Sequence, residues 1–160
     1  GMPDCIRVAL ILRDLFSGLR LVSFVKTSGQ KGLHVCVPLN RGEATFADTK
    51  RYARAVAEVL QRSYPELVTA RMAKEYRRKK VFINWSQNDP SKTMICVYSL
   101  RAREKPTVSF PLSWDDLEKA ARRGGAEKLQ VLHSEAVSRV EKDGDLFRGM
   151  LLRKQRLPHP

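Results

Sequence analysis

The segment Lys26-Thr27-Ser28-Gly29-Gln30-Lys31-Gly32-Leu33-His34-Val35 follows one short apolar run, contains two glycines and leads into a second apolar run. Glycines allow backbone N–H groups to approach a ligand closely. The side chains of Ser28, Lys31 and His34 can each offer a hydrogen bond or a positive charge to phosphate oxygens. Taken alone, the segment is a modest indication of a phosphate-binding site between two strands.

The second apolar run continues beyond this segment. Apolar residues alternate with other residues from Leu33 to Leu39, which predicts a strand with one buried face. His34 then lies on the opposite face from Leu33 and Val35. Two interpretations stay open: His34 belongs to a binding site, or it is packed beneath a second layer.

Patterns elsewhere in the chain predict further helices and strands. Thr45 and Asp48 resemble a capping box that begins a helix ending near Ser63, with Glu58 and Arg62 as an ion pair on its outer face. Periodicity and turn residues predict the other elements. The other helices are expected over residues 5–16, 114–123 and 126–142, and the other strands over 22–25, 81–84 and 94–98.

The composition is strongly basic. Among 160 residues, 30 Lys and Arg stand against 17 Asp and Glu, for a net charge of +13. Such a charge favours polyanions, with nucleic acid as the expected partner; the alternative is a solvated basic surface with no partner. Residues 71–80 hold six of these cations, and a basic tail at 153–160 is expected to fray. No apolar run reaches the about 18 residues of a membrane span, so no membrane partner is expected.

Cysteine and histidine are sparse and scattered. No C-x-x-C pair occurs, so a structural zinc site is not expected and no metal site is assigned. The cysteines are interpreted as reduced core residues of a cytoplasmic, nucleoid-associated protein. The residues concerned are Cys5, Cys36, Cys96, His34, His133 and His159.

Three further motifs follow the glycine segment in a characteristic order. They are Val81-Phe82-Ile83-Asn84-Trp85-Ser86-Gln87-Asn88, Tyr98-Ser99-Leu100-Arg101-Ala102-Arg103, and residues 108–117 ending in Ser113-Trp114-Asp115-Asp116-Leu117. With them the chain resembles the polymerase domain of bacterial DNA ligase D, a member of the archaeo-eukaryotic primase superfamily.

The resemblance implies an α+β fold. It corresponds to the carboxyl-terminal part of a primase-polymerase catalytic core, with a mixed or antiparallel sheet packed against helices. The partial polymerase-like domain is expected over residues 2–152, because Gly1 resembles the remnant of a cleaved tag. Unpaired sheet edges would then be covered by the first helix, by the tail or by a second copy in a homodimer.

The resemblance also implies a function, which is the addition of nucleotides to DNA ends in non-homologous end joining. The expected ligands are DNA and a nucleoside triphosphate, and the family uses Mg²⁺ or Mn²⁺. A ligase or an end-binding protein is an expected partner. By match to the motifs, Ser28, Lys31, His34 and Arg101 would contact the triphosphate. Further DNA or phosphate contacts are assigned to Lys26, Arg77, Arg78 and Arg103.

The metal-binding side departs from the family pattern. Asn84 stands where the family has its third metal-binding Asp, and a neutral amide is a weaker ligand for a hard cation. The family's Asp-x-Asp strand is expected to precede the region seen here. Asp143-Gly144-Asp145 is a weak substitute, because it follows the last long helix in a glycine turn.

Two principal hypotheses remain for the function. One is a nucleotidyltransferase whose missing carboxylates come from an upstream segment or a partner chain. The other is a non-catalytic nucleotide- or DNA-binding module or accessory subunit, which Asn84 favours for this polypeptide alone. A third reading is a degenerate gene product that folds and does little.

Overall fold

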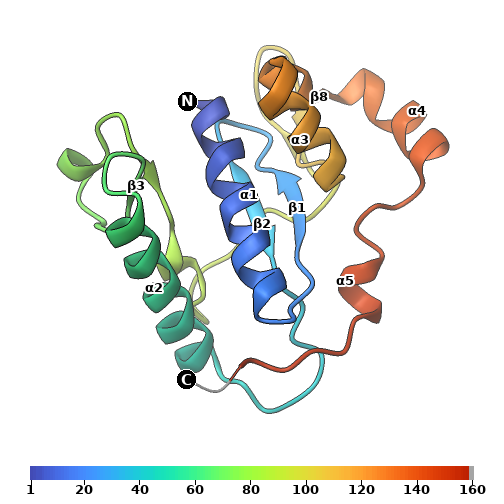
Figure 1. Cartoon of the computed structure of the whole chain (residues 1–160). Coiled ribbons are helices and arrows are strands. Elements are labelled where there is room, and N and C mark those ends of the chain that lie inside the picture. The colour runs from blue at the N-terminus through green and yellow to red at the C-terminus, as the bar shows by residue number, and fades with distance from the viewer. Residues whose placement is uncertain (159–160) are drawn as a thin grey trace.

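The computed structural model describes residues 1–158 and combines helices with short strands (Figure 1). The α-helices are α1 (Met2–Gly18), α2 (Phe46–Ser63), α3 (Trp114–Arg123), α4 (His133–Asp143) and α5 (Gly149–Leu152). Single turns of 3₁₀ helix are η1 (Lys74–Arg77), η2 (Trp85–Gln87) and η3 (Ala126–Leu129). None of the helices within residues 1–158 has the length and apolar character needed to cross a bilayer.

Three small sheets accompany the helices. Antiparallel strands β1 (Phe24–Thr27), β2 (Leu33–Cys36) and β7 (Pro111–Leu112) form one sheet in the order β2-β1-β7. A second sheet pairs β3 (Val68–Thr69) with β4 (Val81–Phe82) in parallel. The third is antiparallel, in the order β5-β6-β8, with β5 (Leu100–Arg101), β6 (Thr107–Val108) and β8 (Val131–Leu132). The expected α+β class with mainly antiparallel sheets is confirmed.

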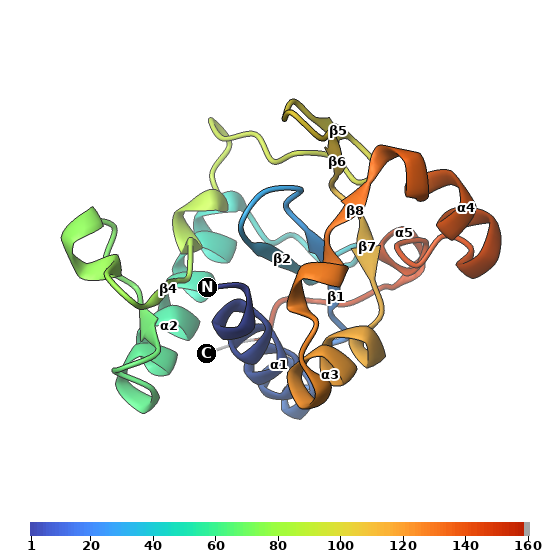
Figure 2. The ribbon, with the colours of Figure 1, turned by 90° about the horizontal axis from the view of Figure 1, so that it is seen from above.

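Helix α1 is the centre of the fold, between α2 on one side and the β1 sheet with α3 on the other (Figures 1 and 2). Its residues Ile6 and Ala9 pack with Val25 of β1 and Leu117 of α3 in one apolar cluster. Val8 belongs to a second cluster that it shares with buried residues of α2 and β3. Two core clusters therefore meet on opposite faces of one helix, which is why α1 is apolar over much of its circumference.

Local capping signals were predicted correctly. Thr45 Oγ1 accepts from the backbone N of Asp48 at 3.2 Å, and the Asp48 carboxylate accepts from the backbone N of Thr45 at 3.0 Å. Ser113 and Asp116 repeat this arrangement at the start of α3. The prediction of an ion pair between Glu58 and Arg62 was wrong, because the Glu58 carboxylate pairs with Arg54 at 2.8 Å instead.

Two element predictions were also wrong, and distant pairing explains the second. Residues 94–98 form no strand; they run as irregular chain into a turn in which Tyr98 has a φ of +65°. The helix expected over 126–142 is divided into η3, β8 and α4. Val131 is fully buried and pairs with Val108 of β6, so tertiary pairing overrides helical periodicity there.

The cysteines and the tail also differ from expectation. Cys96 is exposed, while Cys5 and Cys36 are half-buried, and all three thiols are free. The described part of the tail is anchored: the Gln155 side chain accepts from Val22 N at 2.6 Å and donates to Val22 O at 3.0 Å. His159 and Pro160, the end of the predicted basic tail, lie outside the described residues.

Candidate functional site

The glycine segment forms the turn of a hairpin between β1 and β2. Ser28 N donates to Gly32 O at 2.9 Å and closes the turn. Ser28 Oγ accepts from the backbone N of Gln30 at 3.1 Å and of Gly32 at 3.2 Å. The hydroxyl therefore organises the loop and keeps its own proton available for a ligand.

Arg101 of β5 packs directly against this loop. Gly29 has a φ of +69°, and a Cβ at that position would lie 2.4 Å from Arg101 Cγ. The same Cβ would lie 3.3 Å from the backbone N of Ser109. Gly29 is thus required twice, for its backbone conformation and for the space that Arg101 occupies.

A network of hydroxyl groups joins the loop to the β6–β7 segment. Thr27 Oγ1 donates to Val108 O at 3.1 Å and accepts from Phe110 N at 3.0 Å. Thr107 Oγ1 donates to Gly29 O, and Ser109 Oγ donates to Thr27 O at 2.8 Å. Thr27, Thr107 and Ser109 are all buried, so these bonds fix the loop in place. Sequence reasoning missed this network; the only available signal was the alternation of small hydroxyl residues with apolar ones over 107–110.

Lys26 was predicted to contact DNA or phosphate, and its burial corrects that prediction. Its side chain is 1% exposed, and Nζ donates to Ser109 Oγ at 2.6 Å and to Ile95 O at 2.9 Å. Burial lowers the pKa of this ammonium below its ordinary value, and the nearby Arg101 charge acts in the same direction. Lys26 therefore ties β1 to the 94–98 segment and adds positive potential from beneath the site.

His34 lies opposite Lys26 in the β1–β2 ladder. Its Nδ1 is buried and has no hydrogen-bond partner within residues 1–158. Burial, followed by the charges of Lys26 and Arg101, lowers the pKa of His34 from 6.5 to about 4. The imidazole is therefore neutral at pH 7, half-buried, and in a positive field.

The remaining predicted cations occupy different places. Lys31 is exposed at the tip of the hairpin, and Arg103 is exposed in the turn between β5 and β6. Arg78 is exposed after η1, whereas the Arg77 guanidinium donates to Met72 O and lies 3.9 Å from the Phe82 ring centroid. Arg101 thus lies against the loop that carries Ser28 and Lys31, and His34 lies on the adjoining strand β2, while Arg77 and Arg78 belong to the separate η1 segment.

Asn84 lies at the start of η2, and its side chain serves local structure. Its Oδ1 accepts from Ser86 Oγ at 2.9 Å, and its Nδ2 is 3.4 Å from Gln87 Oε1. Within residues 1–158 there is no group of three or more His, Cys, Asp or Glu side chains that could hold a metal ion. The residues present therefore do not fit the family's divalent cations.

The Asp143-Gly144-Asp145 turn is engaged elsewhere. Tyr98 Oη donates to Asp145 Oδ1 at 2.6 Å, and burial together with this carboxylate raises the pKa of Tyr98 above its usual value. Asp145 also accepts from Phe147 N at 3.0 Å. This carboxylate therefore fastens the chain after α4 to the 94–98 segment.

Residues 1–147 match the family model described as "LigD, primase-polymerase domain". The chain belongs to this family. LigD of Mycobacterium tuberculosis is 42% identical over 146 residues, and LigD of Mycolicibacterium smegmatis is 39% identical over 151 residues. Each alignment covers 91% of this chain and 18% of the relative.

Among solved structures, the polymerase domain of Mycobacterium tuberculosis Ligase D in complex with DNA matches with a TM-score of 0.85 at 39% identity. That match covers 96% of this chain and 51% of the other. This LigD-family chain thus spans about half of a solved polymerase domain and under a fifth of the curated relatives.

Proposed function

We propose that this LigD-family chain binds a nucleoside triphosphate at the β1–β2 loop and DNA on its basic surface, in the repair of DNA ends by non-homologous end joining. The observation that carries the proposal is the arrangement of Ser28, Lys31, His34 and Arg101 around one loop held rigid from below. A rigid set of donors binds an anion with little ordering cost.

Each side chain has a distinct role in this proposal. Lys31 and Arg101 offset the negative charge of the triphosphate, and Arg101 can form two parallel bonds to phosphate oxygens. The Ser28 hydroxyl donates a hydrogen bond to a phosphate oxygen. His34 is neutral in the free chain, and an adjacent triphosphate would raise its pKa by stabilising the imidazolium.

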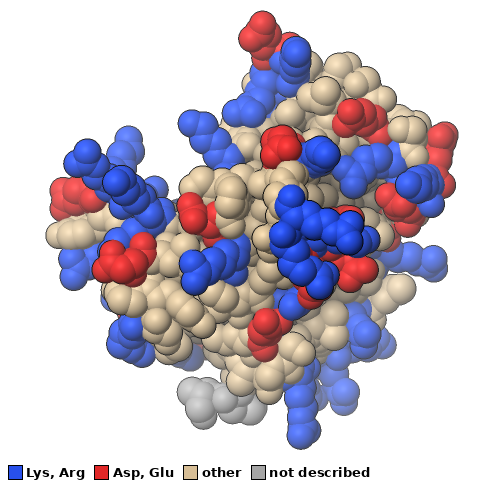
Figure 3. Space-filling model, turned by 45° about the horizontal axis from the view of Figure 1, so that its top comes forward, with Lys and Arg blue, Asp and Glu red and all other residues tan. Residues whose placement is uncertain are grey.

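DNA binding has separate support. The net charge is +13, and Lys and Arg are spread over the face shown in Figure 3, with fewer acidic side chains between them. The similar Mycobacterium tuberculosis domain was solved in complex with DNA. Binding through phosphate contacts weakens steeply with salt, because each contact releases condensed counterions.

Nucleotide transfer by this chain alone is not part of the proposal. Asn84 is neutral and bonded to its neighbours, and the described residues hold no carboxylate cluster. The second candidate function is that of a nucleotidyltransferase whose carboxylates come from another segment or chain. One observation favours it. Strand β2 is at the edge of its sheet, so another segment or chain could pair with it beside Asn84. An apolar pocket of about 190 Å³, lined by Val35 and Ile83, lies between β2 and Asn84.

The nucleotide assignment is tested by titrating a fluorescent ATP analogue against wild type, Lys31→Ala and Arg101→Ala. Loss of a charge-assisted hydrogen bond, worth about 1.5–3 kcal/mol, should weaken binding about 10- to 100-fold. Arg62→Ala, an exposed arginine on α2, is the control and should bind like wild type. Unchanged affinity in both site variants would refute the assignment.

The two candidate functions are separated by primer extension with purified protein in Mg²⁺ or Mn²⁺. No extension is expected from the chain alone. Templated extension would contradict the binding-module reading and establish the enzyme. A homodimer, a ligase partner and nucleoid association stay predictions; light scattering of the purified chain tests the first.

A further inference from the structure

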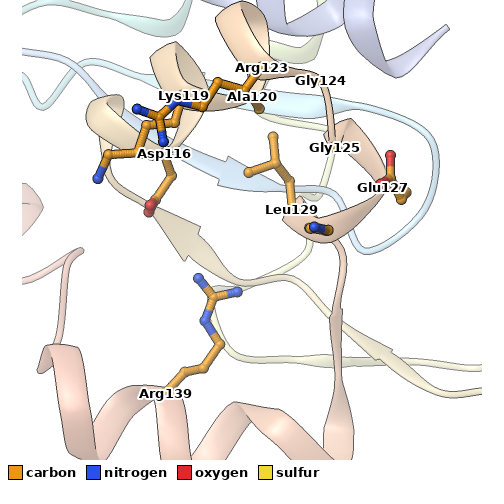
Figure 4. Close-up of a pocket in the computed structure, with 10 residues that line it drawn as sticks. Asp116, Lys119, Ala120, Arg123, Gly124, Gly125, Glu127, Leu129 and Arg139 are labelled. Atoms are coloured by element: carbon orange, nitrogen blue, oxygen red, sulfur yellow. The ribbon is translucent and has the colours of Figure 1, made fainter.

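A second basic cleft lies apart from the triphosphate loop, between α3, η3 and α4 (Figure 4). Its volume is about 430 Å³. Lys119 and Arg123 extend from α3 on one side, and Arg139 reaches toward them from α4 on the other. Lys128 of η3 completes the lining cations, so four positive side chains from three elements surround one opening.

These cations are not neutralised by the protein. None of the four takes part in an ion pair among residues 1–158, although Arg122 and Arg13 nearby both pair with Glu118. Lys119 and Arg123 are four residues apart and share one face of α3, an arrangement that destabilises a helix by repulsion. The dipole at the end of α3 favours Arg123 alone. An anion bound in the cleft would relieve the repulsion.

Two acidic side chains also line the cleft, and together they offset only part of its positive charge. The Asp116 carboxylate accepts from Ser113 Oγ at 2.8 Å as part of the α3 capping box. Glu127 is exposed and lies on the η3 side of the cleft, apart from Lys119 and Asp116 (Figure 4). The four cations against two acids leave the cleft with a net positive charge.

Arg139 is held in position by an aromatic ring. Its guanidinium carbon lies 5.2 Å from the ring centroid of Phe110, which is 2% exposed. This contact restricts the side chain and leaves its N–H groups available on the cleft side. A positioned guanidinium is well suited to a phosphate group.

From this geometry we infer that the cleft binds the phosphodiester backbone of a DNA strand, at a site separate from the triphosphate loop. The inference rests on the proposed DNA binding. The apolar residue Leu129 is 5% exposed and offers no pocket for peptide side chains, which disfavours an acidic peptide as the ligand. Gln130 follows η3 directly, and its Nε2 donates to Gln30 O at 2.7 Å. A strand in the cleft would therefore lie against the element that contacts the triphosphate loop.

The test compares Lys119→Gln/Arg123→Gln with the matched control Arg7→Gln/Arg62→Gln. The control residues are exposed on α1 and α2 and make no ion pair within the described chain. Both double variants lose two positive charges, so the general electrostatic field changes equally. Fluorescence anisotropy with a labelled duplex bearing a 3′ overhang gives Kd at several salt concentrations.

The cleft variant should bind DNA at least about 10-fold more weakly at low salt. The negative slope of the logarithm of the association constant against the logarithm of the salt concentration should become shallower by about 2, whereas the slope of the control variant changes far less. Both variants should bind the ATP analogue like wild type, because the loop is untouched. Equal slopes in the two variants would overturn the inference while wild-type DNA binding stands. Wild type that binds the ATP analogue but no DNA would overturn the DNA half of the proposed function and this site with it. Polyglutamate that displaces DNA from wild type as well as unlabelled DNA does would assign the cleft to an acidic protein instead.

Discussion

Substitution of Gly29 by Ala tests the packing on which the candidate site depends. Two structural terms add at this position: the φ of +69°, and the approach of a new Cβ to 2.4 Å from Arg101 Cγ. The contacted atom is near the base of the arginine side chain, so a shift of its flexible end cannot relieve the clash. The backbone of Val108 and Ser109, at 3.3 Å, limits movement in the other direction.

The magnitude follows from these two terms. An L-residue at positive φ costs about 1–2 kcal/mol, and overpacking of a tight contact costs about 1–3 kcal/mol. Gly29→Ala should therefore lower the free energy of unfolding by about 2–5 kcal/mol. Gly125→Ala is the matched control: its φ is +89°, but its nearest neighbour, Lys128 Cδ, is at 3.5 Å. The free energy of unfolding of Gly125→Ala should fall only by the cost of the positive φ, about 1–2 kcal/mol.

Urea denaturation measures both variants, and a double-mutant cycle with Arg101→Ala identifies the cause. Removing the arginine side chain should recover about 1–3 kcal/mol of the Gly29→Ala loss, because the clash disappears. Gly29→Ala should also weaken binding of the ATP analogue by displacing Arg101. The reasoning is refuted if Gly29→Ala costs no more than Gly125→Ala, or if its cost is the same without the Arg101 side chain.

Three other predictions concern stability and are measured by urea denaturation. Lys26→Met should cost about 1–3 kcal/mol, because Ser109 Oγ and Ile95 O lose their buried donor; an unchanged midpoint would contradict this role. The pKa of His34 is about 4 in the folded chain against 6.5 in the unfolded chain, so the unfolded state binds more protons between these values and stability rises with pH across that window. After allowance for partial exposure the rise is about 1–2 kcal/mol, and it should disappear in His34→Asn; an equal rise in that variant would assign it to other groups. Ser113→Ala removes the α3 N-cap and should cost about 1 kcal/mol, whereas Ser113→Thr, which keeps the hydroxyl, should cost less.

Local signals in the sequence predicted the parts of the fold that local physics determines. The capping boxes at Thr45 and Ser113 each begin a helix where expected, because a hydroxyl and a carboxylate three residues apart satisfy the first free N–H groups. The alternation around His34 correctly predicted a strand, but β2 ends at Cys36 instead of Leu39 and all four of its residues are half-buried, so the expected single buried face is not seen.

Pairing between distant segments was not predictable in the same way. Residues 94–98 have the composition of a strand, yet no neighbouring strand pairs with them, and Lys26 Nζ bonds Ile95 O instead. Val131 has the spacing of a helical core residue, but the edge of β6 is available and pairs with it. Such outcomes depend on which edges are free after folding, and the local pattern of residues within one segment does not contain that information.

The candidate site shows the same division. Ser28, Lys31 and His34 lie in one local motif, so sequence reasoning placed them together without difficulty. The contact between Gly29 and Arg101, and the burial of Lys26 beneath Ser109, arise from the folding of distant segments onto the loop. The Lys26 ammonium was predicted from the sequence to contact phosphate, but in the folded chain it is buried and hydrogen-bonded to Ser109 and Ile95.

The triphosphate loop and the segment that carries Asn84 are fixed to different parts of the fold. The loop is fixed by buried bonds to residues 107–110, in the layer formed by β1, β7 and α3. The segment that carries Asn84 is fixed to the α2 layer instead: Trp85 Nε1 donates to Ala70 O at 2.9 Å, and Asp89 pairs with Lys50 at 2.5 Å. Since different contacts hold the two parts, a change at residue 84 need not disturb the loop. The nucleotide binding that we propose for the loop therefore does not depend on the side chain at position 84, because different contacts hold the two parts of the chain.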